Sequence, residues 1–169
     1  MVKPENVTAC TPIEFGQHTT DTIDAPATND CFSFSGVLSD TIRVRVVKTT
    51  GDLTPFLDLI SIADNKSVCS TVVGELNCVL KMSGAHQLVV SAFGGTASGS
   101  YQLFLQRLNN PVGCSSLTFG DMPAAGSIRN PAEIDCFVMS GEIGAWIRTR
   151  LVETAGANFT GDFEVLRPD

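Results

Sequence analysis

Cysteines are the residues of this sequence whose number and spacing best indicate a specific chemistry. The six are Cys10, Cys31, Cys69, Cys78, Cys114 and Cys136. No C-x-x-C pair occurs, and the two histidines, His18 and His86, are far apart in the sequence, which argues against a zinc site. An even number of cysteines without metal-ligand spacing predicts disulfides, which form in oxidising compartments. We therefore expect a secreted, extracellular or cell-surface protein.

Motifs for catalysis are absent from the sequence. It contains no G-x-S-x-G, no H-E-x-x-H and no glycine loop placed before a helix. We therefore predict a non-catalytic protein without a cofactor. Calcium is the one candidate ion, because Asp52, Asp58 and Asp64 lie near predicted loops and calcium takes oxygen ligands. No D-x-D-x-D-G loop is present, so solvated turn carboxylates are the simpler interpretation and no metal ligand is assigned.

The charge balance excludes further classes of partner. Eighteen acidic against eleven basic residues give a net charge of −7, whereas nucleic-acid binding requires clustered Lys and Arg. No apolar run approaches the ~20 residues of a membrane-spanning helix. We expect neither nucleic-acid binding nor membrane insertion.

The chain repeats itself. "IEFG" at 13–16 returns as "LTFG" at 117–120 with an offset of 104, and from Ile23 onward the offset is 105. Of the 29 positions from Ile23 to Gly51, 14 are identical in the second copy. Such agreement indicates two copies of one structural unit. We predict an N-terminal arm at 1–9, a complete unit at 10–109 and a partial second unit at 110–169, in which "FEVLRPD" aligns with "LDLISIA" at 57–63.

Alternation of apolar and polar residues predicts strands throughout. Ile42, Val44 and Val46 alternate with polar residues in "TIRVRVV" (41–47), and "WIRTRLV" (146–152) repeats the pattern with Ile147 and Leu151 inward. Further strands are expected at 18–24, 31–36, 56–62, 67–72, 76–81, 86–93 and 100–107, separated by Gly-, Asn- and Asp-rich turns. About eight short strands in one unit predict an all-β protein, an antiparallel β-sandwich of jelly-roll type.

The repeat suggests how the cysteines pair. Cys69 and Cys78 flank "STVVGELN", a predicted hairpin, and would pair across it. Cys10 would then join Cys31, tying the first strand to the third. The second copy keeps only Cys114 and Cys136, the counterparts of Cys10 and Cys31, which favours this pairing. A bridge between the two copies is the alternative, and it would leave unpaired thiols.

Trp146 is the only tryptophan, and strand alternation places it on the outer face beside Arg148 and Arg150. Two interpretations are equally compatible with the sequence. The indole lies across the arginine stems in a local cation–π contact, or these three residues form part of an interface between subunits, where Trp and Arg are enriched.

Several phrases together resemble a known family. They are "DCFSFSG" at 30–36, "DCFVMSG" at 135–141 and "GSYQL" at 99–103. They are similar to phrases of the bacterial pre-peptidase C-terminal domain-like family, over the whole first unit and the front of the second. The resemblance implies a non-catalytic jelly-roll sandwich, often in tandem, attached to secreted enzymes or built into surface proteins. Some related collagen- and polysaccharide-binding modules bind calcium, and the acidic cluster that they use is not clearly present here.

A half-length copy departs from the whole-domain plan of that family, and it shapes the two functional hypotheses. Its apolar face and open edges need strands from elsewhere: a continuation of the chain, a second copy, or the arm at 1–9. The first hypothesis is a structural protein that assembles head to tail into a cell-surface filament or layer. The alternative is a binding module that attaches an enzyme or cell to a polymer such as collagen or polysaccharide, with calcium as a candidate aid.

Overall fold

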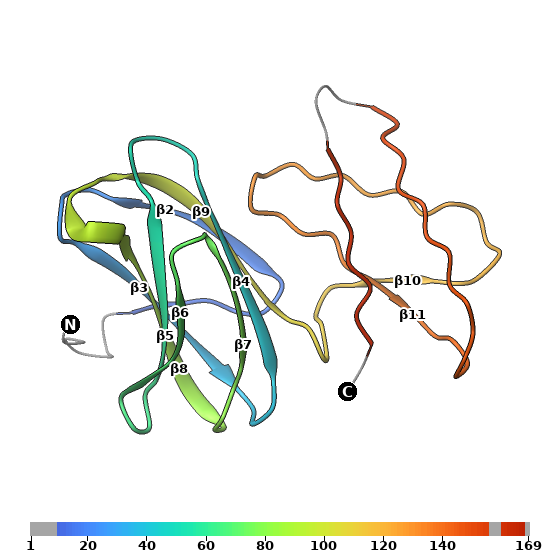
Figure 1. Ribbon diagram of the computed structural model, residues 1–169, viewed down its shortest axis with the longest axis horizontal. Coiled ribbons are helices and arrows are strands. Elements are labelled where there is room, and N and C mark those ends of the chain that lie inside the picture. The colour runs from blue at the N-terminus through green and yellow to red at the C-terminus, as the bar shows by residue number, and fades with distance from the viewer. Residues whose placement is uncertain (1–9, 156–159, 168–169) are drawn as a thin grey trace.

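The computed structural model describes residues 10–155 and 160–167, and strands are the main regular structure of this part (Figure 1). It contains no α-helix and a single 3-10 turn, η2, at Phe93–Gly95. The predicted arm at 1–9 lies outside the described residues. The strands are β1 (Thr11–Pro12), β2 (Gln17–Ile23), β3 (Asn29–Gly36), β4 (Thr41–Lys48), β5 (Pro55–Ser61), β6 (Lys66–Thr71), β7 (Glu75–Val79), β8 (Gly84–Ala92), β9 (Gly99–Arg107), β10 (Ser115–Leu117) and β11 (Phe137–Met139).

Strands β1 to β9 form a sandwich of two sheets. One sheet has the order β1-β3-β8-β5-β6 and the other the order β2-β9-β4-β7. Apart from the short parallel pair β1–β3, the neighbours are antiparallel. Every step from β2 to β9 crosses between the sheets except β5 to β6, which is the strand order of a jelly roll. The predicted fold class is therefore confirmed.

The core lies between the sheets and follows the predicted alternation. Ile42, Val44 and Val46 of β4 are buried, as expected from their period of two. The longest strands, β8 and β9, occupy the middle of their sheets. Strand β8 pairs with β3 and β5, and β9 pairs with β2 and β4. Their inward residues Leu88, Val90, Tyr101, Leu103 and Leu105 are fully buried.

The predicted hairpin between Cys69 and Cys78 is wrong. The segment between Cys69 and Cys78 leads from β6 in one sheet to β7 in the other, so it is a corner between sheets. "FGGTASGS" likewise carries the chain from β8 to β9 in the opposite sheet, partly as η2. Alternation predicts which residues face inward, but it does not specify the partner strand, so a turn between two strands was interpreted as a hairpin.

Residues 114–167 lie beside the sandwich as a second segment with little regular structure (Figure 1). Within its described part the only strands are β10 and β11, which pair in parallel. The predicted strand at 146–152 is therefore wrong, and Ile147 and Leu151 do not point into a core, because they are 42% and 50% exposed. Among the described residues, no strand pairs with this segment.

Candidate functional site

Three disulfides join the pairs that the repeat favours. Cys10–Cys31 links the residue before β1 to β3, and Cys114–Cys136 links the same positions beside β10 and β11. Cys69–Cys78 connects β6 and β7, and so ties the two sheets together at the corner. Disulfides of this kind are typical of exported proteins.

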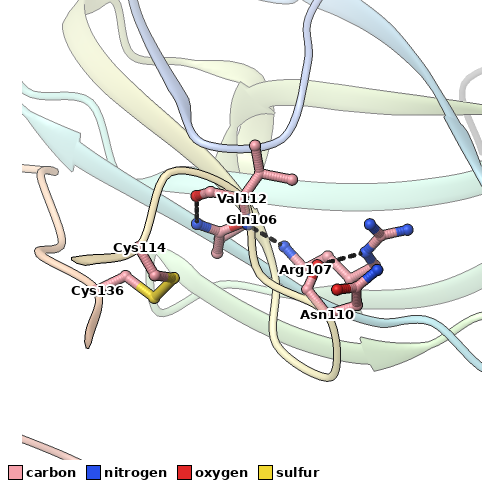
Figure 2. The surroundings of a disulfide bond; sticks show 6 residues. All are labelled: Gln106, Arg107, Asn110, Val112, Cys114 and Cys136. Atoms are coloured by element: carbon pink, nitrogen blue, oxygen red, sulfur yellow. Dashed lines mark hydrogen bonds between the residues drawn. A yellow bond between two sulfur atoms is a disulfide. The ribbon is translucent and has the colours of Figure 1, made fainter. Parts of the chain in front are cut away.

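A hydrogen-bonded joint leads from β9 into the second segment (Figure 2). The buried Gln106 side chain donates to the Val112 carbonyl at 2.9 Å and accepts from the Val112 amide at 3.2 Å. Arg107 Nε donates to the Asn110 carbonyl at 2.9 Å, and its guanidinium lies 5.2 Å from the Phe15 ring centroid. The joint ends at Cys114. The role of Gln106 could not be predicted from the sequence.

The second segment reproduces the backbone geometry of the first unit. Strand β10 pairs with β11 in the register that β1 makes with β3: Thr11 faces Phe32, and their counterparts Ser115 and Phe137 face each other. Three turn hydrogen bonds also recur: Gln17 to Glu14 as Asp121 to Thr118, Thr28 to Ala25 as Glu133 to Asn130, and Asp40 to Val37 as Ala145 to Glu142. Gly16 and Gly120 both have left-handed backbone, with φ of 80° and 85°, which favours glycine.

Side chains at core positions are exposed in the second segment. Its members at these positions are between 37% and 54% exposed, whereas their counterparts in the first unit are at most 4% exposed. The pairs are Phe137 with Phe32, Ile147 with Ile42, Leu151 with Val46, Phe163 with Leu57, and Val165 with Leu59. Among the described residues after Asn109, only Ala132 is buried. We call the surface formed by Phe137, Ile147, Leu151, Phe163 and Val165 the open face.

The difference in exposure between the two copies follows from two central strands that the described second segment lacks. In the first unit β8 separates β3 from β5, and β9 separates β2 from β4. The described second segment holds counterparts of β1 to β5 and none of β8 or β9. Residues 121–128, 146–153 and 161–167 therefore have no neighbouring strand to bond with, and a strand exists only as part of a ladder. Strands β10 and β11 persist because their first-unit counterparts are direct neighbours.

Asp30 and Tyr101 form a partly buried link that the sequence did not reveal. The Tyr101 hydroxyl of β9 donates to Asp30 Oδ2 of β3 at 2.7 Å and joins the two sheets. Burial raises the pKa of Asp30, the Tyr101 hydrogen bond opposes this rise, and Asp21 and Asp24 add to it. Burial and the bond to Asp30 also raise the pKa of Tyr101.

The second segment keeps this aspartate without the tyrosine. Asp135 is the counterpart of Asp30 and is exposed. Within residues 10–155 and 160–167, its carboxylate accepts no hydrogen bond. A signal in the sequence was the repetition of "DC" in both copies, although nothing near it indicated a tyrosine partner.

The predicted interface residues lie at the surface. Trp146 is fully exposed, and Arg148 and Arg150 are exposed as well. Because no strand forms here, alternation does not place the three on a common face. The second segment instead contacts the sandwich through Glu164, whose Oε2 accepts from Arg43 Nη2 at 2.7 Å. This ion pair was not predicted.

The candidate calcium carboxylates do not converge. Asp52 precedes β5 and Asp64 follows it, so they lie at opposite ends of that strand. Asp58 accepts a hydrogen bond from Ser67, and Asp64 lies 3.8 Å from the Lys66 ammonium. In the part of the chain that the structure describes, no three His, Cys, Asp or Glu side chains are grouped as metal ligands would be.

Comparison with known proteins supports the fold. The pre-peptidase C-terminal domain of a collagenase from Bacillus anthracis is 16% identical and has a TM-score of 0.50, covering 63% of this chain and 100% of that domain. Two periplasmic inhibitors of g-type lysozyme give lower scores. PliG of Aeromonas hydrophila has a TM-score of 0.45 at 11% identity, covering 57% of this chain and 96% of its own. PliG of Salmonella Typhimurium has a TM-score of 0.42 at 15% identity, covering 57% of this chain and 97% of its own.

No family model and no curated protein matches the sequence. At 16% identity, the likeness to the collagenase domain establishes a similar sandwich and nothing about activity. Within residues 10–155 and 160–167, no helix is both long enough and apolar enough to cross a membrane.

Proposed function

We propose that this protein is a non-catalytic, exported structural protein whose second segment joins it to further repeat units, so that units are linked head to tail in a surface filament or layer. The observation that carries this proposal is the open face, because five apolar side chains at core positions stand in solvent. A group of exposed apolar side chains at positions that are buried in the first unit indicates a site of interaction. Unpaired strand backbone at the same place favours pairing with another polypeptide.

Three further observations agree with this role. The disulfides suit an oxidising compartment. The hydrogen bonds between Gln106 and Val112 hold the joint that leads from β9 into the second segment. The chain is acidic, which keeps extended assemblies soluble.

Attachment to collagen or polysaccharide is the second candidate, and Trp146 is the observation that favours it. A fully exposed tryptophan suits contact with a polymer. It is a single aromatic residue, however, since Tyr101 is buried. The open face contains more apolar groups, so assembly is preferred.

Sedimentation velocity over a concentration series, together with electron microscopy, tests the proposal. We expect oligomers that grow with concentration, regular fibres, and loss of both in an Ile147→Asp, Leu151→Asp variant. The control is Val73→Asp with Phe93→Asp, because Val73 and Phe93 are exposed apolar residues of the first unit. A stable monomer at neutral pH with the native thermal transition, whatever the concentration, would overturn the proposal.

A further inference from the structure

Strand β2 is an edge of the sandwich that lacks the usual protection against pairing with another chain. It is the longest of the four edge strands, with seven residues, whereas β1 has two, β6 has six and β7 has five. It contains no Lys or Pro, and its register with β9 has no bulge. Among the described residues, no strand pairs with its outer edge. Such an edge favours the addition of a further strand.

The backbone groups at this outer edge follow from the ladder. Thr49 donates to the Ser100 carbonyl, so the even-numbered residues of β9 bond to β4 and the odd-numbered ones to β2. In the register of β2 with β9, these odd-numbered residues face odd-numbered residues of β2. The outer edge therefore presents the N–H and C=O groups of His18, Thr20 and Thr22. Asp21 accepts from the Thr22 amide at 2.9 Å, and the other two amides have no such partner within residues 10–155 and 160–167.

The sandwich has a place for a strand next to β2. The Cys69–Cys78 disulfide sets β6 opposite β7, while β5 contacts β4 and β3 contacts β2. One sheet has five strands and the other has four, so β1 faces no strand in the described chain. A cavity of about 350 Å³ lies between β1 and β2, and its lining includes Thr19 and the core residues Ile13 and Phe32. A fifth strand beside β2 would cover this cavity.

Residues 146–152 have the properties of a strand that fits this place. "WIRTRLV" alternates as clearly as β4 does, but it is exposed and pairs with no strand of the described chain. Its charges are complementary to the receptor edge. Residues 11–29 contain three carboxylates and neither Lys nor Arg, whereas residues 146–152 contain two arginines and no acid. Complementary charges bring the right surfaces together and disfavour wrong pairings.

We infer that residues 146–152 of one copy pair with β2 of a second copy and become the fifth strand of its four-stranded sheet. This inference rests on the proposed function, and it names the contact through which copies join head to tail. Donor and receptor lie in different halves of the chain, so each copy carries one of each. A contact between two different surfaces extends into a filament when its rotation does not close a ring.

Alternation determines which face each residue of the added strand takes. The two arginines remain in solvent, so they lie on the outer face of the sheet. Ile147, Thr149 and Leu151 then point towards β1 and the cavity. Asp21 points inward as well, because its partner in β9 is the buried Tyr101. A register displaced by one residue would turn both arginines into the sandwich.

Asp21 selects one of the remaining registers. The added strand runs antiparallel, as do the other pairs of this sheet. With Leu151 opposite Thr19, Leu151 covers the cavity and the polar Thr149 lies opposite Asp21. A displacement by two residues in either direction would set Ile147 or Leu151 against the Asp21 carboxylate. The pairing of Leu151 with Thr19 is therefore the register of the inference.

A proline at Thr20 tests the pairing. The Thr20 N–H points to the outer edge, so proline removes a donor for the added strand and breaks no bond to β9. We expect Thr20→Pro to weaken assembly in sedimentation velocity at least about tenfold. Thr20→Ala keeps the N–H and should assemble like the native chain. Unchanged assembly of a Thr20→Pro variant that retains the native thermal transition would overturn the inference.

Two defective copies test the direction of the contact. Ile147→Asp with Leu151→Asp disables the donor, and Thr20→Pro disables the receptor. Each variant alone should be a monomer. An equal mixture should form a dimer and nothing larger, because a single intact donor–receptor contact remains between the two. A mixture that stays monomeric, or one that forms fibres, would overturn the inference.

A photoreactive residue in place of Thr20 identifies the occupant without the proline variant. The adduct should form at residues 149–151 of a second copy, and mixing isotope-labelled with unlabelled copies shows that it joins two chains. An adduct with the arm at 1–9, or one within a single chain, would overturn the inference. If the native chain assembles while these tests fail, only the inference falls. If the native chain stays monomeric at every concentration, the proposed function falls and the inference with it.

Discussion

The bond between Tyr101 and Asp30 joins residues 71 positions apart and ties β9 to β3 across the core. Its loss leaves a carboxylate between the sheets without a donor. We expect Tyr101→Phe to lower the free energy of unfolding by ~1–2 kcal/mol. Urea titration followed by far-UV circular dichroism measures this, and Tyr101→Phe with Asp30→Asn should recover part of the loss. An unchanged midpoint in the single variant would contradict the role given to this bond.

Asp30 also makes stability depend on pH. Burial raises its pKa in the folded state above the ordinary value of 3.8, so the folded protein holds this proton more tightly than the unfolded chain does. The stabilisation from Asp30 is therefore complete below pH 3.8 and is lost as pH rises through the raised pKa. We expect Asp30→Asn to be more stable than the native protein at neutral pH, with the difference shrinking towards pH 3.8.

Paired urea titrations across this pH range give the difference directly, because effects common to both proteins cancel. A difference that grows as the pH falls would show that the hydrogen bond from Tyr101, and not burial, dominates the titration of Asp30.

Residues of the candidate site were predictable to different degrees. The cysteine pairs could be inferred because the shorter copy keeps only one pair, and the buried position of Tyr101 follows from alternation. Three contacts could not be inferred: the Tyr101–Asp30 hydrogen bond, the Gln106–Val112 hydrogen bonds and the Arg43–Glu164 ion pair. Each joins positions on different elements, and nothing in the local pattern records such a contact.

At the scale of the element, the corner between β6 and β7 depends on a disulfide. Cys69 and Cys78 are nine residues apart and hold the edges of two sheets together. We expect Cys69→Ser with Cys78→Ser to lower the free energy of unfolding by ~2–3 kcal/mol. The matched control is Cys114→Ser with Cys136→Ser, whose bridge lies outside the sandwich and whose removal should leave the unfolding of the sandwich unchanged.

Thermal and urea unfolding without reductant compare the two variants. Equal losses in both would mean that the second segment unfolds together with the sandwich as one cooperative unit, contrary to the geometry of the corner.

Eight strands of the first unit were predicted within a few residues. Each has an alternating pattern and pairs with at least one neighbouring strand. The same pattern failed at 146–152. "WIRTRLV" reads as a strand as clearly as "TIRVRVV" does, but the sheet position beside it that β9 fills in the first unit is empty in the described chain. Alternation records suitability for a sheet, and a strand exists only when a neighbour completes its hydrogen bonds.

For the whole molecule, the contrast between the two halves should appear in limited proteolysis. Trypsin needs locally open backbone, and Arg148 and Arg150 lie in exposed chain without ladder bonds, whereas Arg45 lies inside β4. We expect the first cuts after Arg148 and Arg150, and a resistant product that retains all nine strands of the sandwich. Mass spectrometry of a time course identifies the products, and early cleavage after Arg45 would contradict this expectation.

The order of the strands along the chain has a consequence for how the sandwich is made. Strands β8 and β9 stand in the middle of their sheets, yet they are the last of the nine to leave the ribosome. Seven earlier strands must wait for them, with pairings that span most of the unit, which slows folding. The described residues of the second segment have no counterparts of β8 and β9, and they keep only the pairing of β10 with β11 and the recurrent turns. The described second segment therefore resembles the front of the first unit without its two central strands.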